Sequence, residues 1–188
     1  MFIFRTNSLC GLVLLFSMAS NVMSDFEGEV VVTWLKNGDY PDREMKLVQS
    51  FSYVDSTGRP WVVPIGAVID GASIPAFFWN TIGPPFVGNY RRASVVHDYY
   101  CNVKTQPWKR VHRMFYEASV VGGVPIPKAK IMYAAVYAKG PRWPTPGVLG
   151  ARVQPTPDIT DDELTSLSNW IESTVPSLNM IEDRLQQY

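Results

Sequence analysis

The spacing of hydrophobic positions changes near residue 75 of the chain. Before that point, runs of β-branched and aromatic residues are separated by turn signals such as Asn37-Gly38-Asp39 and Asp55-Ser56-Thr57-Gly58. A proline at position 64 ends one such run or marks a sheet edge. The pattern predicts a small antiparallel β-meander, with strands at about 29–35, 46–54, 61–64 and 65–69.

After residue 75, apolar residues recur at helical spacing. They predict a short turn at 76–82 and three main helices, at about 89–102, 107–122 and from 127 to 140. Residues 141–158 hold five prolines and predict an extended connector. Because strands precede helices along the chain, the predicted fold class is α+β.

The predicted helical half ends in a C-terminal helical segment. Thr160 and Glu163 have the spacing of a capping box, which predicts a helix that runs through Ile171. Pro176 interrupts this helix, and a last turn or two of helix is expected to run to about Arg184. Residues 25–142 are therefore expected to form one α+β domain, and residues 143–188 a proline-rich connector with an acidic helical extension.

The first 24 residues have the organisation of a signal peptide. Arg5 precedes an apolar run that begins at residues 12–16, and Val22-Met23-Ser24 offers small residues for cleavage. The apolar run is short and is interrupted by polar residues, so cleavage is favoured over an uncleaved anchor. We therefore expect a periplasmic or secreted protein without a stable membrane span. Only Cys101 remains after cleavage, so no internal disulfide can form, and its apolar surroundings predict a buried thiol.

Charge is spread unevenly, although the net charge is zero. Residues 91–142 contain ten Lys and Arg against two acids, whereas seven Asp and Glu follow from Asp158 onward against Arg184 alone. The simplest interpretation is that the acidic tail packs near the basic middle. The alternative is a basic face for phosphate, nucleic acid or anionic lipid. We expect the partner to be an envelope component or another periplasmic protein, and not a nucleic acid.

Polar residues with chemical potential gather where the predicted strands give way to helices. His97 and Asp98 are helix neighbours, so their side chains diverge by about 100° and each needs a partner on another element. Asp70 and Ser73 lie at the strand–helix junction, where Ser73 either caps the short helix or offers a functional hydroxyl. With an orienting partner, His97 would be a general base, and Asp70 and Ser73 complete the candidate catalytic set.

A second histidine, His112, follows fifteen residues later on the next predicted helix. Two antiparallel helices would bring it close to His97, and Asp98 and His112 are then candidate ligands of a divalent cation, together with His97 and Asp70. The spacing matches no strong metal signature.

The alternative to any functional role is a core histidine. In that interpretation, His97 is hydrogen-bonded to a strand carbonyl, and Asp98 caps a turn or pairs with Arg91 or Arg92.

A set of motifs occurs at Ile69–Pro75, Phe78-Trp79, Ile82–Pro85, Ala93, Val95–Tyr99, Arg113–Ala118 and Met132–Val136. Together they resemble a phage and bacterial family known as domain of unknown function 1353, over residues 45–142. The family has no settled activity, so the resemblance implies a fold and a site more than a reaction. Its pattern usually has an aspartate where this chain has His112. A weaker resemblance is to secreted phospholipases, which implies His97 as the base and Asp98 as a calcium ligand.

Two functions are consistent with these residues. The first is a hydrolase that uses His97 as a general base, with a divalent cation held by Asp98, and that acts on lipid or peptidoglycan of the envelope. The alternative is a non-catalytic periplasmic binding or inhibitory protein of phage or bacterial origin. A cleft open to solvent above His97 favours the enzyme, whereas burial of His97 with every polar atom paired favours the binding protein.

Overall fold

The computed structural model describes residues 23–36, 44–70 and 88–188. The predicted signal peptide lies outside these residues except for its last two positions. The predicted turn at 76–82 and Ser73 also lie outside them. The remaining candidate site residues all fall within the described part of the chain.

Six short strands form the N-terminal part. They are β1 (Asp25–Glu27), β2 (Val32–Trp34), β3 (Met45–Leu47), β4 (Phe51–Val54), β5 (Pro60–Val63) and β6 (Val68–Ile69). All pairings are antiparallel, but the strands form two three-stranded sheets, in the orders β1-β4-β5 and β2-β3-β6, and not one continuous meander.

The predicted strand at 46–54 is divided between the two sheets. Leu47 belongs to β3, and Phe51 opens β4 in the other sheet. Residues 48–50 between them have exposed side chains. Hydrogen bonds from the Val48 amide to Val31 and from the Ser50 hydroxyl to Val63 hold this stretch, and not the packing of side chains in the core. The buried side chains of β4 and β5 face each other in register, with Phe51 opposite Val63 and Tyr53 opposite Trp61. This β4–β5 hairpin forms one wall of the groove described below.

The helical half agrees closely with the sequence pattern. A 3₁₀ turn, η2 (Gly88–Tyr90), leads into α2 (Arg91–Val103), α3 (Trp108–Val121), α4 (Ile126–Lys139), α5 (Asp161–Thr174) and α6 (Leu178–Leu185). Both halves of the capping box form at the start of α5, where the Thr160 hydroxyl accepts from the Glu163 amide and the Glu163 carboxylate accepts from the Thr160 amide. The α+β fold class is thus confirmed.

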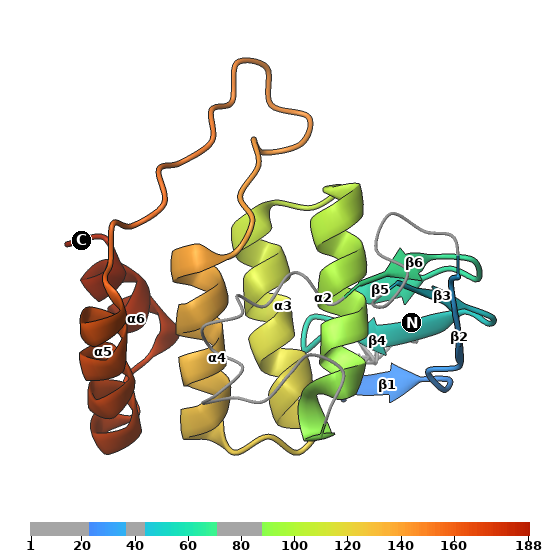
Figure 1. Cartoon of the computed structure of the whole chain (residues 1–188), viewed down its shortest axis with the longest axis horizontal. Helices are drawn as coiled ribbons and strands as arrows, with labels where there is room; N and C mark the ends of the chain where they lie inside the picture. The colour runs from blue at the N-terminus through green and yellow to red at the C-terminus, as the bar shows by residue number, and fades with distance from the viewer. Residues whose placement is uncertain (1–22, 37–43, 71–87) are drawn as a thin grey trace, which may run out of the picture.

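The elements stack in sequence order from the sheets to the C-terminal helices. In Figure 1, α2, α3 and α4 lie side by side, the strands lie beyond α2, and α5 and α6 cover the opposite side of α4. Helix α4 is consequently buried almost all round, and every residue from 131 to 138 is buried. Among the described residues, no helix combines the length and apolar character needed to cross a membrane.

The acidic tail packs against the basic middle, as the charge distribution predicts. The Arg113 guanidinium on α3 forms an ion pair with Glu182 on α6, and its Nε donates to the same carboxylate oxygen over 2.9 Å. Tyr133 on α4 donates its hydroxyl to that oxygen over 2.5 Å. One carboxylate therefore ties three helices together.

Candidate functional site

The two histidines meet in the interior between α2 and α3. The Nε2 atom of His97 lies 2.9 Å from Nδ1 of His112, and both side chains are fully buried. Cys101 lies four residues after His97 and therefore on the same face of α2, with Sγ 3.6 Å from His97 Nε2. The predicted proximity of the two histidines is present in the structure, and the predicted burial of Cys101 is confirmed.

Aromatic rings enclose this His97–Cys101–His112 cluster. The ring of Phe115 lies 4.6 Å from that of His97, centroid to centroid. The indole rings of Trp108 and Trp143 lie 5.5 Å and 6.4 Å from that of His112. Removal of an imidazole ring from water disfavours its charged form, so the cluster favours neutral rings.

Burial changes the acid–base behaviour of both rings. It lowers the pKa of His97 well below its usual range, and the facing His112 acts in the same direction. It also lowers the pKa of His112 to about 3, an effect that the Pro141 backbone carbonyl opposes only in part. Both imidazoles are therefore neutral at physiological pH. In the described part of the chain, His112 Nε2 lacks a hydrogen-bond partner of acceptable geometry.

The Asp98 carboxylate, which was expected at the site, points elsewhere. Asp98 is buried, and its Oδ2 accepts a 2.8 Å hydrogen bond from the backbone amide of Asp70, at the end of β6. This contact fixes α2 to the sheet. Arg92, proposed as one partner of Asp98, places its guanidinium 4.3 Å from the centroid of the Phe26 ring.

The structure therefore changes the membership of the candidate metal set. Within residues 23–36, 44–70 and 88–188, the side chains that bring three ligand atoms within 4.8 Å of one another are His97, Cys101 and His112. Asp98 and Asp70 do not belong to this group. The structure also differs from the core-histidine alternative. The ring of His97 lies against His112 and Cys101, whereas that alternative places it against a strand carbonyl.

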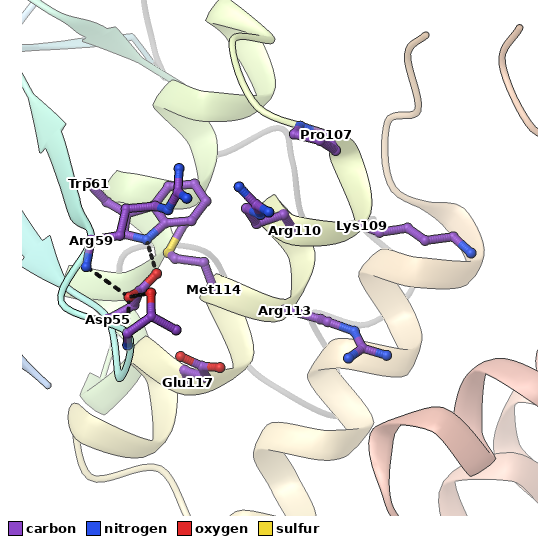
Figure 2. A pocket seen from close by; sticks show the side chains of 10 residues that line it. Asp55, Arg59, Trp61, Pro107, Lys109, Arg110, Arg113, Met114 and Glu117 are labelled. Carbon is purple, nitrogen blue, oxygen red and sulfur yellow. Dashed lines mark hydrogen bonds between the residues drawn. The ribbon is translucent and has the colours of Figure 1, made fainter. Parts of the chain in front are cut away.

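A second candidate site is an open groove between the β4–β5 hairpin and α3. It has a volume of about 610 Å³, which is in the range of small-molecule sites. Figure 2 shows Arg110 extending from α3 toward Arg59 and Trp61 of the hairpin, whereas Lys109 and Arg113 extend away from them. The groove is lined by Asp55, Thr57, Arg59, Trp61, Pro107, Lys109, Arg110, Arg113, Met114 and Glu117.

Two of these cations converge without a carboxylate between them. The Nη1 atoms of Arg59 and Arg110 each lie 3.5 Å from the side-chain oxygen of Gln106. In the part of the chain that the structure describes, the ion pair formed is that of Arg113 with Glu182. Two like charges that share one neutral oxygen leave a positive site that an anion would stabilise.

The acids of the groove do not neutralise this pair. Asp55 accepts hydrogen bonds from the Thr57 amide and hydroxyl, the Arg59 amide and the Trp61 indole, at 2.6–3.0 Å. Burial raises the pKa of Asp55, but bonds from Thr57 and Trp61 outweigh it and hold the pKa below its usual value. Burial and the nearby Asp55 raise the pKa of Glu117. Asp55 is thus fixed as the structural anchor of the hairpin turn.

Sequence reasoning missed Cys101 as a site residue and missed this groove. The spacing of four between His97 and Cys101 is a signal that was present in the sequence. The groove joins residues far apart along the chain, so no local pattern indicates it.

Comparison with known proteins supports the family assignment. Residues 45–136 match a family model described as "Protein of unknown function (DUF1353)", so the chain is similar to that family over this segment, as the motifs predict. The α5 and α6 helices lie outside the matched segment. No comparison supports the weaker resemblance to secreted phospholipases, and no solved structure gives a significant match.

Two curated relatives come from Sinorhizobium fredii (strain NBRC 101917 / NGR234). Uncharacterized protein y4jT is 46% identical over 132 residues, which cover 69% of this chain and 39% of the relative. Uncharacterized protein y4iH is 43% identical over 103 residues, which cover 54% of this chain and 43% of the relative. The chain therefore spans about two fifths of the length of these curated relatives.

Proposed function

We propose that the protein is a non-catalytic binding protein of the cell envelope, which holds an anionic group of its ligand in the groove between the β4–β5 hairpin and α3. The observation that carries this proposal is the convergence of Arg59 and Arg110 on the single oxygen of Gln106. Guanidinium groups bind phosphate and carboxylate in a planar, bidentate manner, so two of them form a suitable cradle for either anion.

The walls of the groove are rigid, which favours binding. Trp61 is held by Asp55 on one side and by the edge of the Tyr100 ring, whose centroid lies 4.9 Å away, on the other. Arg110 projects from the first turn of a regular helix, α3. A site whose side chains are positioned before the ligand arrives loses less conformational entropy on binding.

The envelope location rests on the predicted signal peptide at residues 1–24, which lies outside the described residues except for its end. Phosphate and carboxylate groups are abundant on lipid head groups and on peptidoglycan fragments. Both ligand types therefore offer the chemistry that this groove would recognise.

The burial of His97 counts against the alternative, a hydrolase with His97 as general base. A general base must come within hydrogen-bond distance of the proton that it abstracts, directly or through one water. His97 is fully buried and in contact with Phe115, His112 and Cys101. The burial of the His97 side chain therefore supports the binding function over the hydrolase.

The test is a binding measurement with a charge-matched control. Full-length protein is titrated with vesicles of phosphatidylglycerol or phosphatidylcholine, and with soluble muropeptides. We expect the wild type to bind the anionic ligand class, and the double variant Arg59→Gln/Arg110→Gln to bind it at least about tenfold more weakly, a loss of about 1.4 kcal/mol. The variant Arg91→Gln/Lys128→Gln removes the same charge outside the groove and should bind like the wild type.

Two results would overturn the proposal. Equal weakening of both double variants would show that overall charge, and not the groove, controls binding. Release of product from any of these ligands, with loss of that release in a His97→Gln variant that remains folded, would establish the hydrolase instead.

A further inference from the structure

A cluster of three buried side chains with metal-ligating atoms lies in the interior, apart from the groove. We infer that His97, Cys101 and His112 form a three-coordinate site for one monovalent copper ion. The inference goes beyond the proposed function and does not depend on it, because no residue of this cluster lines the groove.

The donor atoms converge on one point. His97 Nε2 and His112 Nδ1 are 2.9 Å apart, and Cys101 Sγ is 3.6 Å from His97 Nε2. Bond lengths of about 2.0 Å to nitrogen and 2.3 Å to sulfur, at trigonal angles, place two nitrogens about 3.5 Å apart and a nitrogen and the sulfur about 3.7 Å apart. The sulfur is already near its required distance from His97 Nε2 and lies within 4.8 Å of the His112 donor. The two rings need to separate by about half an ångström.

The helices provide this geometry through local spacing. His97 and Cys101 occupy positions i and i+4 of α2, which project from the same face of the helix. His112 lies near the start of α3, which packs antiparallel to α2 after a short connection. The ligands therefore come from two regular helices that are already packed together, so little of the chain must be ordered when the ion binds.

The donor types select a soft transition metal. Thiolate sulfur favours Cu(I) and zinc over harder cations, and imidazole suits both ions. A trigonal set of two histidines and one cysteine is the equatorial ligand set of blue-copper sites in proteins. Calcium and magnesium, which require oxygen ligands, do not fit this set.

The net charge of the complex distinguishes copper from zinc. Binding releases the thiol proton of Cys101, and both imidazoles stay neutral, so Cu(I) gives an uncharged complex and Zn²⁺ leaves one positive charge. Burial of a net charge among aromatic rings is unfavourable. The guanidinium of Arg142, 4.4 Å from the Trp108 ring centroid, also acts on His112 and disfavours additional positive charge. Asp98 is not a member of the ligand cluster, and its carboxylate accepts a hydrogen bond from the Asp70 amide. It therefore does not supply a second anionic ligand that would neutralise this charge.

The test begins with the reduced full-length protein under anaerobic conditions. Cu(I) is supplied in a complex with a chromophoric chelator such as bicinchoninate, and its transfer to the protein is followed by loss of colour. We expect one equivalent to bind and to raise the melting temperature by mass action. X-ray absorption of the loaded wild type should show one sulfur and two nitrogen scatterers.

Variants separate this site from adventitious thiol binding. Cys101→Ser preserves the size of the side chain but removes the sulfur ligand. Loss of a residue that only supports a ligand lowers metal affinity by roughly 10–100-fold, so we expect Cys101→Ser to lower Cu(I) affinity by more than this. Cys10→Ser removes the other cysteine of the chain and should bind copper like the wild type. If Cys101→Ser does not fold, as judged by circular dichroism, the absorption spectrum of the wild type still decides the question.

Three results would overturn the inference. They are an absence of Cu(I) transfer to the wild type, a loss of transfer on replacement of Cys10, and a stronger rise in melting temperature with Zn²⁺ than with Cu(I) at equal free concentration. None of these results affects the anion-binding proposal, which the Arg59 and Arg110 variants test separately.

Discussion

The imidazole rings of His97 and His112 are hydrogen-bonded to each other across the α2–α3 interface, with Nε2 of the first 2.9 Å from Nδ1 of the second. One ring donates its N–H and the other accepts, so the contact requires that at least one ring remain neutral. Since both rings are fully buried, this link makes stability depend on pH.

The first prediction concerns acid sensitivity. In the unfolded chain each histidine has a pKa near 6.5, whereas burial lowers the pKa of His112 to about 3 and that of His97 well below its usual range. The unfolded state therefore binds more protons below pH 6.5. Stability from the neutral rings is present above pH 6.5 and is lost as pH falls toward the folded-state values, by up to about 1.4 kcal/mol per pH unit for each ring.

Urea unfolding between pH 7 and pH 4.5 measures this dependence. His112→Asn keeps a polar side chain but removes one titrating ring, so the free energy of unfolding should depend less steeply on pH. An identical slope in wild type and variant would contradict the assignment of neutral histidines.

The second prediction concerns the hairpin anchor. Asp55→Asn keeps the shape of the side chain, but its amide N–H₂ then faces either the Trp61 indole N–H or the donors of Thr57 and Arg59. A buried donor without an acceptor costs about 1–3 kcal/mol, so we expect a loss of about 2 kcal/mol in the free energy of unfolding. Glu29→Gln, on the exposed chain, should change stability by less than about 0.5 kcal/mol. Equal effects would show that Asp55 has no anchoring role.

The third prediction concerns the link between α3 and α6. Arg113→Met removes the cation of the ion pair and leaves the mostly buried Glu182 carboxylate with Tyr133. The loss should be about 2 kcal/mol, below the 3–5 kcal/mol of a fully buried pair, because the Arg113 side chain is 41% exposed. Asp183→Asn alters the adjacent exposed acid and serves as the control in chemical denaturation. A similar loss in both variants would argue against a specific link.

The fourth prediction concerns the start of α5. Thr160→Ala removes the hydroxyl that accepts from the Glu163 amide, and should cost about 1 kcal/mol in thermal or urea unfolding. Thr165→Ala lies in the exposed interior of the same helix and should be neutral or slightly stabilising, since alanine has the higher helix propensity. The reverse order of the two effects would exclude a capping role.

Local signals predicted the helical half well. The ends of α3 follow from Pro107 and Gly122, and the start of α5 follows from its capping box, so each boundary is determined by a few neighbouring residues. The partition of the strands was not predictable in this way. Strand pairing depends on contacts between distant residues, and nothing near Gln49 in the sequence indicates that the chain leaves one sheet for the other.

The candidate site was predictable to a similar extent. A short connection between two helices was enough to predict that His97 and His112 approach each other. The direction of Asp98 toward the Asp70 amide was not predictable, because it depends on where β6 lies relative to α2. The pairing of Arg59 with Arg110 across the groove depends in the same way on the packing of the hairpin against α3.

The burial of α4 has a consequence for where this chain can be cut. The family segment ends at residue 136, inside α4, and the outer side of that helix is covered by α5 and α6. A fragment that stops at residue 142 would expose to water a wall of tyrosines, alanines and aliphatic side chains, and would tend to self-associate. We therefore expect a fragment that keeps α5 and α6 to fold better than one that ends with the matched segment, and expression boundaries should include both helices.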